Sequence, residues 1–156
     1  MKREQLTDAL VQWIHDEGMR GTIPEKRMDD HVVIGRFTPQ MLAILGCNDR
    51  ELVTSVSHIE KMMFDHAISA ARLKNLHGMI CTPEKIFRSA SQPATSIVVM
   101  TIETLRHVPI IVPIHLDKPG ATGKAPAHWV ASAYAKDQPA MLAKWEARGL
   151  LLWQQK

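Results

Sequence analysis

The apolar positions of this chain change from a helical period near the N-terminus to a strand period further on. Leu6, Leu10 and Trp13 recur at helical spacing and predict a helix over 3–17, followed by a loop of glycine, proline and charge. From about residue 86 onward, short apolar runs separated by turn residues predict strands instead. Helices followed by strands are typical of an α+β protein, so we expect N-terminal helices packed on a small antiparallel sheet meander.

Two further helices have recognisable ends in the sequence. The segment 38–46 has Thr38 as N-cap, a proline at the first helical position and Gly46 just past its end. In the next helix, Ser57 opens the S-x-x-E pattern of a capping box. The apolar spacing behind that box predicts a helix that continues to about Asn75.

The strand pattern is interrupted by proline. Strands are predicted at 32–35, 51–56, 86–89, 96–103, 109–116, 128–135 and 150–153, with a helix from about 139 before the last of them. Pro109 and Pro113 both fall in the strand at 109–116. Because proline cannot donate to the hydrogen-bond ladder, we expect this strand to have an unpaired side or a bulge.

The strand at 128–136 sorts its side chains by type. Alternate residues of a strand point to opposite faces, so His128, Ser132 and Tyr134 are predicted to share one face. Trp129 and three alanines occupy the other face. A polar row of this kind can back a small catalytic or RNA-binding cleft, but it is also the pattern of a solvated antiparallel sheet.

The composition limits the classes of function that the chain can have but does not select one of them. The chain has 156 residues, a net charge of +3 and a pI near 9.0, which permits a nucleic-acid partner but does not require one. The two cysteines lack zinc-site spacing and the common phosphate-loop and hydrolase motifs are missing, so we expect no metal and no cofactor. We also expect a cytoplasmic protein that does not contact membranes. Its predicted division is an N-terminal extension, 1–31, and an α+β domain, 32–156.

With these motifs missing, the side chains left to carry chemistry are histidines, hydroxyls, a phenol and cations. That set suits metal-independent RNA cleavage, in which the ribose 2′-OH attacks its own phosphate and the enzyme supplies a base, an acid and cations. His66 lies on the apolar stripe of the helix predicted from Ser57, where it either faces a cleft or is a buried histidine with one hydrogen bond. His115 either joins the polar face of the sheet or faces solvent.

The order of several short segments along the chain resembles that of a known protein family. These are TPQMLAILG, PEKIFRS, SIVVMTIE, PIIVPIHLDK, HWVASAYAK and WEARGLLLW. In this order the chain resembles, over 38–156, the phage-encoded members of the barnase–EndoU–colicin–RelE-like nuclease group, often found at the end of MuF-type phage proteins. The resemblance implies a small α+β RNase fold and a ribonuclease of toxin or phage-conflict settings. Its implied partners are RNA, such as tRNA or mRNA, and an inhibitor or antitoxin protein.

The resemblance also implies roles for particular residues. The implied catalytic residues are His66, Arg88, Ser132 and Tyr134, and the implied phosphate-binding residues are Ser89, Lys124 and Lys136. In relatives the helix histidine is often followed by proline, whereas Ala67 follows here. Each assignment has an ordinary structural alternative, such as a surface ion pair for Arg88 or a buried ring for Tyr134. The competing hypothesis for the whole chain is a non-catalytic protein- or nucleic-acid-binding module, with a partner docked on the N-terminal helix.

Overall fold

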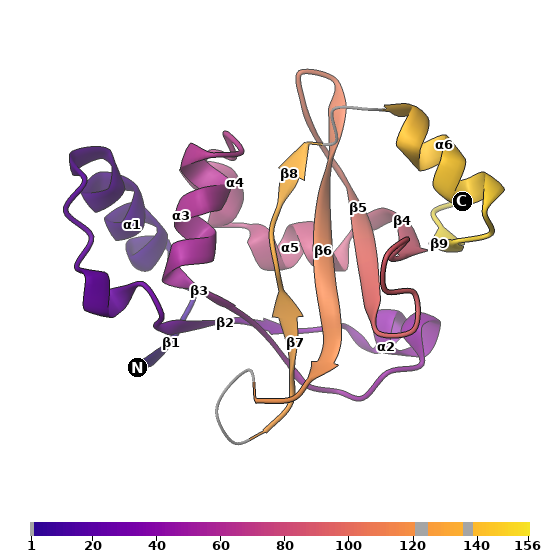
Figure 1. Ribbon diagram of the computed structural model, residues 1–156, viewed down its shortest axis with the longest axis horizontal. Coiled ribbons are helices and arrows are strands. Elements are labelled where there is room, and N and C mark those ends of the chain that lie inside the picture. The colour runs from indigo at the N-terminus through magenta and orange to yellow at the C-terminus, as the bar shows by residue number, and fades with distance from the viewer. Residues whose placement is uncertain (1, 121–124, 136–138) are drawn as a thin grey trace.

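The computed structural model describes residues 2–120, 125–135 and 139–156, and this part forms a mixed nine-stranded sheet with six α-helices (Figure 1). The helices are α1 (Asp8–Arg20), α2 (Pro39–Leu45), α3 (Val56–Phe64), α4 (Ala70–Leu73), α5 (Leu76–Cys81) and α6 (Pro139–Ala147), with a 3₁₀ turn at Glu25–Arg27. The strands are β1 (Arg3–Gln5), β2 (His31–Arg36), β3 (Glu51–Ser55), β4 (Pro83–Arg88), β5 (Ser96–Leu105), β6 (Val108–Lys118), β7 (Ala127–Val130), β8 (Tyr134–Ala135) and β9 (Leu151–Gln154).

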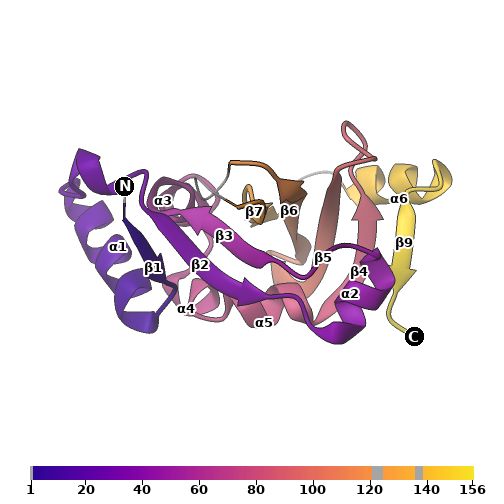
Figure 2. The same cartoon turned by 90° about the horizontal axis from the view of Figure 1, so that it is seen from below.

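The sheet is larger than the predicted meander. Its strand order is β1-β2-β3-β7-β6-β5-β4-β9, and β8 pairs with β6. The antiparallel part from β4 to β7 agrees with the sequence, but β1 pairs with β2 and β3 with β7 in parallel. The α+β class is therefore confirmed, while the small, purely antiparallel sheet is wrong. Seen from below, β1 and α1 lie at one end of the molecule and β9 and α6 at the other (Figure 2).

The N-terminal segment begins with a strand, which the predicted helix over 3–17 missed. The helix α1 starts after Thr7, whose hydroxyl oxygen accepts the N–H of Leu10 at 3.1 Å, and it ends at Gly21 with φ of 69°. Leu10 and Ile14 of α1 are buried in the main core. Residues 2–30 thus share a sheet and a core with the chain that follows.

The capping residues of α2 are as predicted, with Thr38 accepting the N-cap hydrogen bond and Gly46 left-handed at the C-terminus. The predicted start of α3 is wrong. The strand β3 ends at Ser55, and the hydroxyl oxygen of Ser55, rather than that of Ser57, accepts the N–H of His58. The predicted continuation to Asn75 is also wrong. The helix ends at Phe64, and two shorter helices, α4 and α5, follow.

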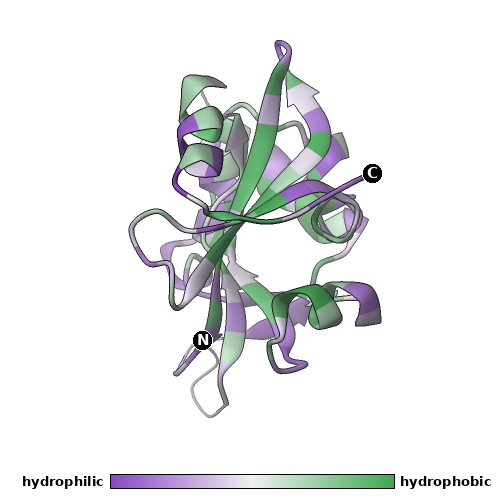
Figure 3. Cartoon of the chain, turned by 90° about the vertical axis from the view of Figure 1, so that its right-hand side faces the viewer, coloured by the Kyte–Doolittle hydropathy of each residue, from purple (hydrophilic) through white to green (hydrophobic). Residues whose placement is uncertain are grey.

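Two apolar clusters cover opposite faces of the sheet. Alternate residues of β5 divide between them, with Ile97 and Val99 in the larger cluster under α1, α3 and α5. Val98 and Met100 belong to the smaller cluster, which includes Trp145 of α6. Several strands are coloured hydrophobic over much of their length, and hydrophilic colour appears in several of the loops and helices (Figure 3). None of the helices in the described ranges has both the length and the apolar character needed to cross a bilayer.

Candidate functional site

A row of polar and aromatic side chains crosses three strands on the sheet face opposite α5. In register, Ser96 of β5 lies beside His115 of β6, and His115 lies beside Trp129 of β7. Cross-strand partners share a face, so their side chains stand next to one another. A groove of about 310 Å³ lies between this row and α6, and we call it the His115 groove. Its polar lining consists of Ser89, Ser91, Gln92, Ser96, His115 and Tyr134.

His115 is arranged as a proton acceptor. Its Nδ1 lies 2.6 Å from the hydroxyl oxygen of Ser96, and that hydroxyl donates to the side-chain oxygen of Gln92 at 3.2 Å. When the single hydroxyl proton of Ser96 is given to Gln92, Nδ1–H of His115 donates to Ser96 and Nε2 is the acceptor; in the other tautomer the hydroxyl donates to Nδ1. Burial, and then the nearby ammonium of Lys118, lower the pKa of His115 and keep the ring neutral at neutral pH. This is the geometry of a general base oriented by a second group.

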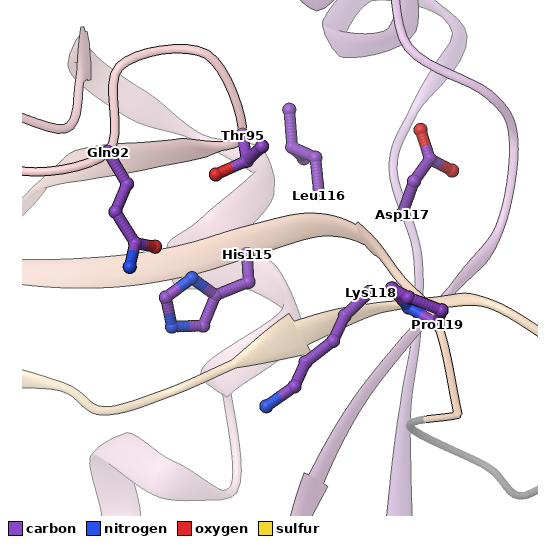
Figure 4. Close-up of a pocket in the computed structure, with 7 residues that line it drawn as sticks. All are labelled: Gln92, Thr95, His115, Leu116, Asp117, Lys118 and Pro119. Carbon is purple, nitrogen blue, oxygen red and sulfur yellow. The ribbon is translucent and has the colours of Figure 1, made fainter.

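A β-bulge brings Lys118 to the same face as His115. Between these two residues β6 advances three positions while the facing strand advances two. The extra residue is accommodated at Asp117, which has φ of 50° and is held by the Nε of Arg50 at 2.6 Å. Figure 4 shows the result, with His115 and Lys118 on one side of β6 and Leu116 and Asp117 on the other. A cation is thereby placed beside the imidazole, around a pocket of about 390 Å³.

A second bulge moves Tyr134 to this face. The chain advances four positions from Val130 to Tyr134, but only three positions between their partners Ile114 and Ile111 on β6. Pro113 lies opposite the break and has no N–H for the ladder. The predicted common face of 128–136 is therefore wrong: Val130 packs in the main core, whereas Tyr134 packs against the cluster that contains Trp145. The predicted irregularity of the proline-containing strand is confirmed.

Tyr134 also borders a second pocket, of about 290 Å³, which we call the His66 pocket. The rings of His66 and Tyr134 lie 5.4 Å apart between centroids at an angle of 39°. Arg106, from the turn of the β5–β6 hairpin, lines the same pocket. Burial raises the pKa of the Tyr134 phenol, so the hydroxyl keeps its proton at neutral pH. The His66 pocket therefore brings together the protonated phenol of Tyr134, the imidazole of His66 and the guanidinium of Arg106.

The structure separates the other predicted site residues. Arg88 is register partner to Ile97, a residue of the main core, so it lies on the opposite face of the sheet from Tyr134. Ser89 does line the His115 groove. Ser132 lies in the irregular segment 131–133 between β7 and β8. Lys124 and Lys136 lie outside the described residues.

Sequence reasoning missed three polar groups of this face, and their position explains why. The sequence predicts Ser96 only as the first residue of the strand 96–103, and no pattern in it indicates that Ser96 and Gln92 approach His115. Lys118 lies three residues after His115, a spacing that places two side chains on opposite faces of a regular strand. Only the bulge at Asp117 reverses that rule.

Comparison with known families identifies the chain at the level of a domain family. The model of the phage MuF C-terminal domain matches residues 57–156, and the chain belongs to this family. The matched segment contains His66, His115, Lys118, Trp129 and Tyr134, which build most of the polar face. Comparisons with curated proteins and with solved structures gave no match.

Proposed function

We propose that this phage domain is a metal-independent endoribonuclease of the barnase–EndoU–colicin–RelE-like type. The observation that carries the proposal is the hydrogen-bonded pair of His115 and Ser96 beside Lys118 in an open groove. A neutral imidazole with a free acceptor nitrogen can take the proton of a ribose 2′-OH as that oxygen attacks the adjacent phosphate. RNA is then the substrate, and an inhibitor protein would act by covering the groove.

The remaining groups of the face supply the other needs of this reaction. The Lys118 ammonium is placed to balance the charge that develops on the phosphate. Tyr134, which keeps its proton, is placed to donate to the leaving oxygen or to hold a phosphate oxygen. His66 and Arg106 border Tyr134 on its other side, so the RNA strand continues from the His115 groove into the His66 pocket.

The test is incubation of the purified protein with total RNA in EDTA, using a variant matched to the proposed base. His115→Asn keeps an amide nitrogen that can donate to Ser96 but removes the basic nitrogen. We expect the cleavage rate to fall by about a hundredfold or more, because a general base contributes roughly two to four decades. Arg88→Ala, on the opposite face, should leave the rate unchanged. Cleavage that disappears in EDTA and returns with magnesium, or that survives in His115→Asn, would overturn the proposal.

One observation favours the competing hypothesis of a protein-binding module. Met19 at the end of α1 and Phe64 at the end of α3 are exposed, with 68% and 40% of their surface accessible, and Phe64 stacks on His15. The apolar side of α1 is otherwise used in the core, where Leu10 is buried. A partner that binds this end of α1 should lose affinity for Met19→Glu. A variant that binds as well as the wild type would remove this hypothesis.

A further inference from the structure

A third pocket opens on the same sheet face, on the far side of His115 from α6. It has a volume of about 360 Å³, and we call it the Trp129 pocket. This volume lies within the usual range of small-ligand sites, roughly 300–1,000 Å³. Its lining residues are Asp29, His31, Ser55, Ser57, His58 and Trp129.

Aromatic rings form the walls of the Trp129 pocket. The His58 ring lies perpendicular to the Trp129 ring at 5.3 Å between centroids, and the His31 ring lies 5.8 Å away at 66°. Edge-to-face contacts of this kind fix the orientation of the indole. The indole also packs on Val33 and Val53, which hold its base against the sheet. A flat ligand that displaces the Lys118 ammonium from over the ring therefore meets an aromatic surface of fixed orientation.

The polar groups of the Trp129 pocket suit the edge of a neutral heterocycle. Burial, followed by nearby cations, lowers the pKa of His31 and of His58, so both rings are neutral at neutral pH. Nδ1 of His58 is engaged by the Ser55 hydroxyl at 2.6 Å, which leaves its Nε2 directed elsewhere. Neutral imidazoles, serine hydroxyls and the Asp29 carboxylate together offer both donors and acceptors, as base edges require.

Lys118 links the Trp129 pocket to the His115 groove. Its ammonium lies over the Trp129 ring, 5.3 Å from the ring centroid. The same ammonium lowers the pKa of both His58 and His115, so it stands between the two sites. Trp129 and His115 are themselves register partners on neighbouring strands. A phosphate held by Lys118 would therefore have the Trp129 pocket on one side and the proposed base on the other.

We propose that the Trp129 pocket binds one unpaired nucleobase of an RNA strand by stacking on Trp129, with the phosphate beside that base held by Lys118. Base–aromatic stacking accepts every base and requires an unstacked strand, so the substrate is single-stranded RNA. The choice of RNA over single-stranded DNA, and the assignment of this strand to the His115 groove, rest on the proposed ribonuclease function. The binding site itself does not.

Binding of an uncleavable strand tests the inference separately from catalysis. The probe is a fluorescein-labelled 2′-O-methyl RNA oligonucleotide, whose blocked 2′-oxygen cannot attack, and the measurement is its fluorescence anisotropy. Trp129→Ala should weaken binding roughly 5- to 150-fold, the factor expected for one base–aromatic stack. Trp129→Phe should retain most of the affinity. Trp153→Ala, on β9 and register partner of the core residue Ile86, is the matched control and should bind within twofold of the wild type.

The role of Lys118 gives a second measurement that does not depend on the tryptophan variants. Loss of one phosphate contact should reduce the slope of log K against log salt by about 0.7 for a single strand. We expect that change for Lys118→Gln and no change for Arg88→Ala, which removes a cation from the other face. An unchanged slope would contradict the placement of a phosphate at Lys118.

The outcomes separate this inference from the ribonuclease proposal. Binding that depends on Trp129 without any RNA cleavage refutes the ribonuclease and keeps the nucleobase site. Cleavage of RNA with affinity that is the same in the wild type and Trp129→Ala refutes the nucleobase site and keeps the ribonuclease. No measurable binding of the 2′-O-methyl strand by the wild type also refutes the nucleobase site.

Discussion

His128→Ala should destabilise the protein strongly, because this histidine is a structural residue beneath the polar face. It is fully buried, and its ring packs on Phe37 at 5.1 Å between centroids. Its Nδ1 accepts the backbone N–H of Asp117 at 3.0 Å, and its Nε2 donates to the backbone oxygen of Asn48 at 2.8 Å. Truncation leaves both backbone groups without these partners.

The expected loss is about 3–5 kcal/mol of unfolding free energy. Both hydrogen bonds are part-buried, so each backbone group left unpaired contributes the lower part of the usual range, about 1–2 kcal/mol, and the lost ring contact adds about 1 kcal/mol. Urea unfolding followed by circular dichroism measures the change, with the exposed His107→Ala as the control, expected to change stability by under about 0.5 kcal/mol. Asp117 forms the bulge that presents Lys118, so folded His128→Ala should also bind RNA more weakly. A loss below about 1 kcal/mol would refute the reasoning.

Three further predictions concern the histidines with lowered pKa values and the left-handed residue Ala67. Lys118→Gln removes a positive charge that disfavours imidazolium, so it should raise the pKa of His115 and His58 but not that of His31, as an NMR titration of the ring protons would show. Because these three histidines have lowered pKa values in the folded state, the unfolded chain takes up protons first as the pH falls. Urea unfolding should therefore give a free energy that is greatest above pH 6.5 and decreases below it; a free energy that is flat or rises on acidification would contradict this. Ala67 has φ of 57°, a left-handed conformation that glycine adopts more easily than alanine. Ala67→Gly should therefore raise the melting temperature and increase the unfolding free energy by about 1 kcal/mol, and an unchanged melting temperature would indicate that the turn is unstrained.

The ends of helices were predictable where one local interaction decides them. In α2, Thr38 and Gly46 act as the sequence indicates because an N-cap hydroxyl and a left-handed glycine need only their own turn. The start of α3 was not predictable in this way. Ser55 and Ser57 are both capable caps, and pairing of β3 with β2 up to Ser55 selects the first of them.

The faces of the strands were predictable only where the ladder is regular. Strict alternation put Tyr134 with His128 and separated His115 from Lys118, and one bulge reverses each of these relations. Pro113 signalled an irregularity, but a proline does not say how many residues the opposite strand will insert. His66 and Tyr134, both predicted as site residues, lie side by side in the structure, although His66 lies in the turn after α3 and not on the helix.

The most direct measurement of the central claim is the chemistry of the cleaved bond. A single-stranded RNA oligonucleotide is incubated with the protein in EDTA, and the product ends are identified by mass spectrometry. The same strand is then made with one 2′-deoxynucleotide at the cleaved position. The proposed 2′-OH attack predicts a 2′,3′-cyclic phosphate in the first case and complete loss of cleavage in the second. Cleavage of the 2′-deoxy strand at the same bond, or a 5′-phosphate on the product, would contradict it.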